Sequence, residues 1–141
     1  MDYEYKGIRL GDSVEKALDK LERKYIKFDK LRNALLYRKK NEEVEEAIYI
    51  HIFIGRVGFI HIRNKDYYPS EDIKIGTIIT EELKEKYELY YDEDEYLEVY
   101  LSKKYPKFAL VLEVADYVNY MNYKERICGY TFDDQDSFDH F

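Results

Sequence analysis

The sequence has a single cysteine, Cys128, which excludes an intrachain disulfide. Cys128 lies in an apolar run typical of a strand, where we expect a buried and inert thiol. The longest apolar run, 47–54, contains a histidine and is far shorter than the ~20 residues of a membrane-spanning helix. The opening residues Met-Asp-Tyr-Glu-Tyr-Lys lack the apolar segment of a secretory signal. We therefore expect a soluble, cytoplasmic protein without a membrane partner.

Motifs for catalysis and for cofactor binding are also missing. Gly7 and Gly11 are not followed by the lysine of a phosphate-binding loop, and no strand precedes them. Ser13 stands at a predicted helix start, where capping explains it, and Cys128 has no recognisable base nearby. The acidic runs 42–46 and 92–95 are typical of solvated loops rather than of a carboxylate pair in a pocket. The sequence predicts a non-catalytic protein with no cofactor.

Two histidines, His51 and His61, are candidates for cross-strand neighbours in a hairpin, and such a pair can begin a metal site. A third ligand is required, and no Cys, Asp or Glu stands at a convincing spacing. The favoured interpretation is that both are half-buried structural histidines and that no metal is bound. A small-ligand or metal-dependent protein that uses His51 and His61 stays open as an alternative.

Tyrosine and acidic residues are abundant. The 17 Tyr and 7 Phe favour strands and also suit half-wet contact surfaces. Residues 1–70 carry 15 Lys+Arg and 12 Asp+Glu, a net +3, whereas residues 71–141 carry 8 and 18, a net −10. This distribution disfavours direct nucleic-acid binding by the second half and suits a basic partner. Plain solubility is the alternative explanation.

The sequence contains two similar segments, Gly7–Val14 and Ile73–Ile79, separated by 65 positions. Each is an apolar–basic–apolar run followed by a glycine and a predicted helix start, capped by Asp12 in the first copy and Thr77 in the second. Helix-spaced apolar residues follow each copy, and alternating strand patterns come next. The predicted helix faces are Val14, Ala17, Leu18, Leu21 and Tyr25 in the first unit and Ile79, Leu83, Tyr87 and Tyr90 in the second. The strand candidates are 32–38, 48–54, 57–63, 96–101, 107–114, 117–123 and 126–132.

The similarity extends beyond the two opening segments. The pattern at Ala34 and Leu36 recurs 65 positions later, and the alternation of 48–54 recurs 60 positions later. We therefore predict an α+β fold of two tandem helix-plus-antiparallel-meander units that form one domain, with chance similarity as the alternative. The predicted parts are unit one 7–63, a linker 64–72, unit two 73–132 and an acidic tail 133–141.

A helix can cover only one face of a sheet, so alternation predicts which residues are covered. We expect the helices to cover Ile48, Ile50, Ile52, Ile54, Phe108, Leu110, Leu112 and Val114. The opposite face is then predicted to carry Tyr49, His51, Phe53, Phe59, His61, Tyr96, Glu98, Tyr100, Glu113, Tyr130 and Phe132. An aromatic face with carboxylates between the rings indicates a binding surface. Packing of the half-sheets on each other, or dimerisation, would also explain it.

The repeated unit, which opens with Gly-Ile-Arg-Leu-Gly-Asp-Ser and again with Ile-Lys-Ile-Gly-Thr, resembles the tandem α/β units of beta-lactamase inhibitor protein-like domains. That resemblance spans most of 7–132 and implies a sheet face that binds a partner protein without a cofactor. The chain lacks the disulfides of that family. Its small size, acidity and high Tyr content also resemble bacterial immunity proteins, which neutralise a cognate polymorphic or contact-dependent toxin in the cytoplasm.

The leading hypothesis is a cytoplasmic immunity protein that occludes a basic toxin domain, such as a nuclease. The predicted contact residues are Tyr96, Glu98, Tyr100, Glu113, Tyr130 and Phe132, together with Asp92, Glu93, Asp94 and Glu95. The protein is expected to be a monomer or weak dimer. An alternative of a different class is a structural or assembly module that dimerises through the aromatic sheet face.

Overall fold

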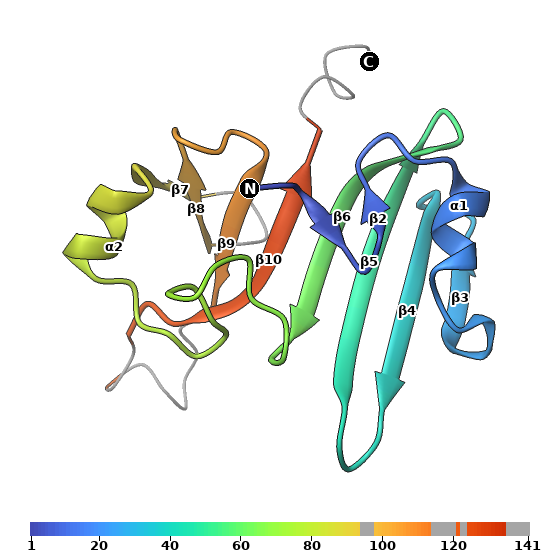
Figure 1. Cartoon of the computed structure of the whole chain (residues 1–141), viewed down its shortest axis with the longest axis horizontal. Coiled ribbons are helices and arrows are strands. Elements are labelled where there is room, and N and C mark those ends of the chain that lie inside the picture. Colours follow the sequence, from blue (N-terminus) through green and yellow to red (C-terminus); the bar gives the residue numbers. More distant parts are fainter. Residues whose placement is uncertain (94–97, 114–120, 122–123, 135–141) are drawn as a thin grey trace.

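The computed structural model describes residues 1–93, 98–113, 121 and 124–134, and it shows a mainly β protein (Figure 1). An eight-stranded antiparallel sheet is accompanied by a two-stranded sheet and two helices of six residues each. The elements are β1 Glu4–Tyr5, β2 Ile8–Arg9, α1 Val14–Asp19, the 3-10 helix η1 Arg23–Tyr25, β3 Ile26–Asp29, β4 Ala34–Lys40, β5 Glu45–Phe53, β6 Arg56–Asn64, α2 Glu81–Lys86, β7 Leu89–Glu93, β8 Glu98–Ser102, β9 Phe108–Leu112 and β10 Ile127–Asp133. No helix among these residues is long and apolar enough to cross a bilayer.

The large sheet has the strand order β3-β4-β5-β6-β10-β9-β8-β7. Four consecutive strands thus form each half, and the halves meet where β6 pairs antiparallel with β10. Strands were predicted from alternation at the positions of β4, β5, β6, β8, β9 and β10, and all six are present. Of the 117–123 candidate, only Met121 lies within the described residues.

The hydrophobic core lies on one face of the sheet, and both helices contribute to it. Ile48, Ile50 and Ile52 are buried there, as predicted, and so are Phe108, Leu110 and Leu112 in the second half. Ala17 and Leu21 from the α1 region belong to the same cluster as Leu83 and Tyr87 from the α2 region. Ile54 was wrongly placed in this set, because it occupies the turn after β5 with φ 50° and is 80% exposed. Val114 lies outside the described residues.

The helices are shorter than predicted and begin at other residues. The N-cap of α1 is Ser13, whose hydroxyl accepts from the Lys16 N–H, whereas Asp12 accepts from the Arg9 N–H before the helix. The N-cap of α2 is Thr80 rather than Thr77. With only six residues each, these helices depend on packing rather than on their own propensity.

The sequence did not predict either edge strand, β3 or β7. Residues of β3 follow directly after the predicted first helix, and β7 spans residues assigned to the second helix and to an acidic turn. Tyr90 was expected on a helix face and instead lies on β7. Short runs with few apolar residues carry little strand signal, and edge strands of antiparallel sheets often have this character.

The two opening segments make matching contacts with the last strand of their own half. The Gly11 N–H donates to the Val57 carbonyl over 2.8 Å, and the Gly76 N–H donates to the Ile127 carbonyl over 2.7 Å. The guanidinium groups of Arg56 and Arg126 donate to the Gly11 and Gly76 carbonyls, at 3.0 and 3.4 Å. Both glycines have φ near +90°, where a side chain would be strained.

Candidate partner-binding surfaces

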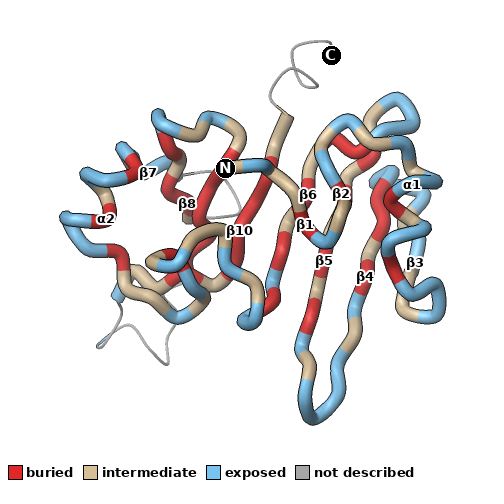
Figure 2. The backbone as a smooth tube through the Cα atoms, in the orientation of Figure 1, coloured by how far each residue is buried: buried red, intermediate tan, exposed pale blue. Residues whose placement is uncertain are grey.

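Three of the predicted contact residues lie in the core. Tyr100, Tyr130 and Phe132 are 5%, 0% and 0% exposed, and all belong to the hydrophobic cluster under the helices. Figure 2 shows buried backbone running through the centre of the sheet where β10 pairs with β6. Placing these rings on an open sheet face was therefore wrong, and they are excluded as contact residues.

For Tyr130 and Phe132 the physical reason is a β-bulge, and each half of the sheet contains one. In β10, Cys128 is an extra residue between Ile127 and Gly129, and Gly58 has the same role in β6. A bulge interrupts the period of two, so residues beyond it change face relative to a simple count. The register confirms this, because Tyr130 lies opposite Ile62.

Tyr100 faces the core because it lies directly opposite Leu110. Its hydroxyl donates to the Glu125 carboxylate over 2.7 Å, and the Lys84 ammonium lies 3.9 Å from that carboxylate. Burial, followed by the hydrogen bond to Glu125, raises the pKa of Tyr100. The polar tip of Tyr100 therefore binds within its own chain.

The other predicted contact residues have mixed positions. Asp92 is exposed on the edge strand β7, and Glu98 is half-buried at the start of β8. Glu113 is half-buried, and its backbone N–H donates to the Arg126 carbonyl at 2.9 Å. Glu93 ends β7, and nothing is described of its side chain. Asp94, Glu95 and Tyr96 lie outside the described residues.

An acidic surface with exposed tyrosines does occur at the β7 end of the sheet, where α2 leads into the edge strand. We call it the acidic edge, and its exposed residues are Glu82, Glu85, Glu88, Tyr90, Tyr91 and Asp92. Tyr90 and Tyr91 are 42% and 45% exposed, and the Tyr91 ring packs edge-on against Tyr100 at 5.7 Å. Among the described residues, these four carboxylates form no ion pair.

The two histidines lie on the outer face of the sheet, as alternation predicted, but they are not opposite each other. His51 pairs with Phe59, and His61 pairs with Tyr49. Burial, with a smaller contribution from Arg63, lowers the pKa of His61 to about 4, so its ring is neutral at physiological pH. No group of three metal-ligating side chains occurs in the part of the chain that is described.

The outer face is more exposed on the strands of the first half than on β10 and β9. One row of paired residues crosses all eight strands on this face: Lys27, Leu36, Tyr49, His61, Thr131, Ala109, Leu101 and Tyr90. Leu36, Tyr49 and His61 are partly exposed, whereas Thr131 and Ala109 are buried. At the far end of the same row, Leu101 is partly exposed and Tyr90 is exposed.

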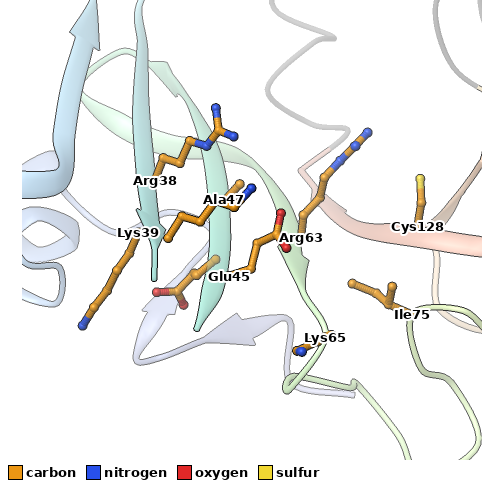
Figure 3. Close-up of a pocket in the computed structure, with 10 residues that line it drawn as sticks. Arg38, Lys39, Glu45, Ala47, Arg63, Lys65, Ile75 and Cys128 are labelled. Atoms are coloured by element: carbon orange, nitrogen blue, oxygen red, sulfur yellow. The ribbon is translucent and has the colours of Figure 1, made fainter. Parts of the chain in front are cut away.

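A depression of about 360 Å³ lies on this open part of the sheet. We call it the cationic cup, and its outer-face lining is Lys27, Leu36, Arg38, Ala47, Tyr49, His61 and Arg63. A second cleft of about 520 Å³ shares Arg38, Ala47 and Arg63 and continues to Lys65, Ile75 and Cys128 (Figure 3). Figure 3 shows Arg38, Arg63 and Cys128 extending to one side of the ribbons, and Lys39 to the other. Burial raises the pKa of the Cys128 thiol.

Glu46 also borders the second cleft, but its role is structural. The acidic run 42–46 was predicted to be a solvated loop, and Glu46 is instead a β5 residue with 1% exposure. Its Oε2 accepts from the Tyr5 hydroxyl and from the Asn64 amide at 3.3 Å, and it pairs with Lys6 at 2.6 Å. This network ties the β1–β2 hairpin to the sheet. Burial, followed by the hydrogen bond to Glu46, raises the pKa of Tyr5.

Comparisons with known proteins give no support to either resemblance. Comparison with protein-family models, curated proteins and solved structures finds no match for the chain. The resemblances to inhibitor-like domains and to immunity proteins therefore stay predictions.

Of the predicted contact residues, Asp92 lies on the acidic edge, whereas Tyr90, Tyr91 and the cationic cup were not predicted. Tyr90 and Tyr91 directly precede the acidic run 92–95, which was the sequence signal for this surface. The assignment of Tyr90 to a helix concealed it. The sequence signal for the cationic cup was the position of Arg38 and Arg63. Each arginine occupies an outward position on a predicted strand, 32–38 or 57–63.

Proposed function

We propose that this is a non-catalytic immunity or inhibitor protein that binds a basic toxin domain through the acidic edge. The observation that carries the proposal is an exposed, acidic, Tyr-bearing edge strand beside the helix α2. Carboxylates without ion-pair partners among the described residues attract a cationic surface. The half-exposed Tyr90 and Tyr91 provide apolar area on the two faces of the edge strand. Nuclease domains have such cationic surfaces because they bind phosphates.

The edge strand adds a second means of binding. One side of β7 pairs with β8, and its other side is the end of the sheet. An extended segment of a partner can pair with such an edge through backbone hydrogen bonds, while side chains at alternating positions give specificity. Tyr91 packs on Tyr100, so the edge presents an aromatic ring that is already held in place.

We also propose that the chain is a tandem repeat of one unit, with both helices on one face of the sheet. Matching hydrogen bonds at Gly11 and Gly76 support this proposal. A constant shift in residue number within each of the paired strands also supports it. The β4–β5 pair Leu35 and Ile50 becomes the β8–β9 pair Tyr100 and Leu110 by adding 65 and 60. If the copies share a scaffold, the surface that differs between them carries the function, and the acidic edge differs in charge from the β3 edge.

The test uses a toxin domain encoded next to this chain's gene, co-expressed with it. We expect wild-type protein to restore growth and the E85Q/D92N variant to restore it poorly. The matched control is E42Q/E43Q, which removes the same charge from the exposed β4–β5 turn. With purified proteins, E85Q/D92N should lower the association rate several-fold, and salt should lower the wild-type rate.

Two outcomes contradict the proposal. Equal association rates for E85Q/D92N and E42Q/E43Q would show that the acidic edge does not guide binding. A rate that does not respond to salt would remove the electrostatic contribution. A stable dimer in analytical ultracentrifugation, disrupted by substitution of Tyr49 or Phe59, would favour the assembly module instead.

A further inference from the structure

The two depressions on the outer face form one continuous trough. They share Arg38, Ala47 and Arg63, which are neighbours in one row across β4, β5 and β6. One lobe is largely apolar, with Leu36 and Tyr49, and the other is more polar. Volumes of about 360 and 520 Å³ are in the range of small-molecule sites.

The shared row places two cations around a small residue. Adjacent strands are ~4.8 Å apart, so the Cα atoms of Arg38 and Arg63 are separated by roughly 10 Å. Ala47, with its small side chain, lies on the strand between them. Both arginines are exposed, and neither forms an ion pair among the described residues. Glu45 and Glu46 are the carboxylates of the polar lobe, and Glu46 is already bound to Lys6. Cations therefore outnumber carboxylates among the residues that line this lobe.

Neighbouring side chains hold this arrangement in place. The neutral His61 ring accepts a hydrogen bond through Nε2 from Nε of Arg63 at 3.4 Å. That bond orients the guanidinium and leaves its two terminal nitrogens for a ligand. The Tyr49 ring packs edge-on against Phe59, with centroids 6.3 Å apart, and forms one wall of the apolar lobe.

We propose that this trough binds a small organic anion that carries a planar ring, such as a nucleoside monophosphate or an aromatic carboxylate. The anionic group lies between Arg38 and Arg63, where charge-assisted bonds are strongest. The ring lies on Leu36 and Ala47 against Tyr49. This site does not depend on the acidic edge and goes beyond the proposed toxin binding.

A long polyanion fits this surface less well than a small ligand. The chain carries a net charge of −7, with −10 in residues 71–141, so phosphates that extend beyond the trough are repelled. In the second half, the position of Arg63 is taken by Asp133, 70 residues later, so the cationic pair is not repeated. The two arginines of the site therefore belong to the first half alone.

The test measures binding of AMP, adenosine, inorganic phosphate and benzoate to the full-length protein by calorimetry and NMR. We expect AMP to bind at least about tenfold more tightly than adenosine or phosphate alone, because only AMP fills both positions. Benzoate binding would indicate that a carboxylate suffices, and its absence that phosphate is required. Arg38→Gln and Arg63→Gln should each weaken AMP binding about tenfold or more.

Control variants separate binding from folding. Arg23→Gln removes an exposed arginine of η1 and should leave AMP binding unchanged. Ala47→Leu adds no charge and should block the trough while the melting temperature stays close to that of the wild type. No binding by AMP or benzoate at about 10 mM overturns the proposal. Equal affinity in wild type, Arg38→Gln and Arg63→Gln also overturns it. Tighter binding of a single-stranded octanucleotide than of AMP would assign the trough to nucleic acid instead.

Discussion

Gly129 is a position where one added methyl group should have a measurable effect on stability. A Cβ placed there would lie 2.9 Å from Nε2 of His61, 3.0 Å from the Ile62 carbonyl oxygen and 3.3 Å from Cγ of Arg63. Carbon atoms do not normally approach this closely, so the neighbours must move. Gly129 is also buried beside the bulge at Cys128, where β6 and β10 join the two halves.

Gly129→Ala should therefore lower the free energy of unfolding by about 1–3 kcal/mol, the usual cost of overpacking. For a chain of this length, about 3–4 °C of melting temperature correspond to each kcal/mol, so the expected decrease is about 3–12 °C. Thermal unfolding followed by circular dichroism, and urea unfolding followed by Tyr fluorescence, measure both quantities. Cys128→Ala, one residue earlier in the bulge, is the control and should have a smaller effect.

A double-mutant cycle tests the cause of this loss. His61→Ala removes the nearest contact, so the combined variant should lose less stability than the two single effects added together. The contact with the Ile62 carbonyl is backbone and remains, so the relief should be partial. A melting temperature of Gly129→Ala equal to that of the wild type, or strictly additive effects, would refute the reasoning.

Three further measurements test the placement of other groups. Tyr130→Ala should cost about 3–5 kcal/mol in urea unfolding because the ring is in the core, whereas Tyr91→Ala at the surface should cost less than about 1 kcal/mol. An NMR titration should give His61 a pKa of about 4, and because this is below the unfolded value of 6.5, stability should be lost as pH falls through that interval. Burial raises the pKa of Asp133 to about 6, so its charge opposes folding above that pH; Asp133→Asn should be more stable than the wild type near pH 8 and lose this advantage below about pH 4.

The sequence contained enough information to predict most of the sheet. Alternation identified six of the eight strands of the large sheet. The shifts of 65 and 60 positions correspond to the observed pairing of β4 with β5 and β8 with β9. These strands were predictable because one face of each is covered, and burial forces apolar residues into a period of two. Edge strands are buried on little of their surface, which is why β3 and β7 were missed.

The candidate site was predicted less well, and the reason is local. The extra residue at Cys128 moved Tyr130 and Phe132 from the expected outer face into the core. A bulge leaves no clear pattern in a single sequence, because both flanking segments still alternate. A comparison of the two halves contained the missing information, since Gly58 and Cys128 stand 70 positions apart at the same place in the hairpin.

The sheet separates the two proposed sites far enough that they should act independently. Four strand spacings lie between Arg63 on β6 and Asp92 on β7, which is roughly 19 Å. The Debye length is ~8 Å at physiological salt, so charges on one surface are screened from the other. Arg63→Gln should therefore leave toxin association unchanged, and Asp92→Asn should leave AMP affinity unchanged. A change in both for either variant would mean that one ligand spans the sheet or that the two sites are coupled through it.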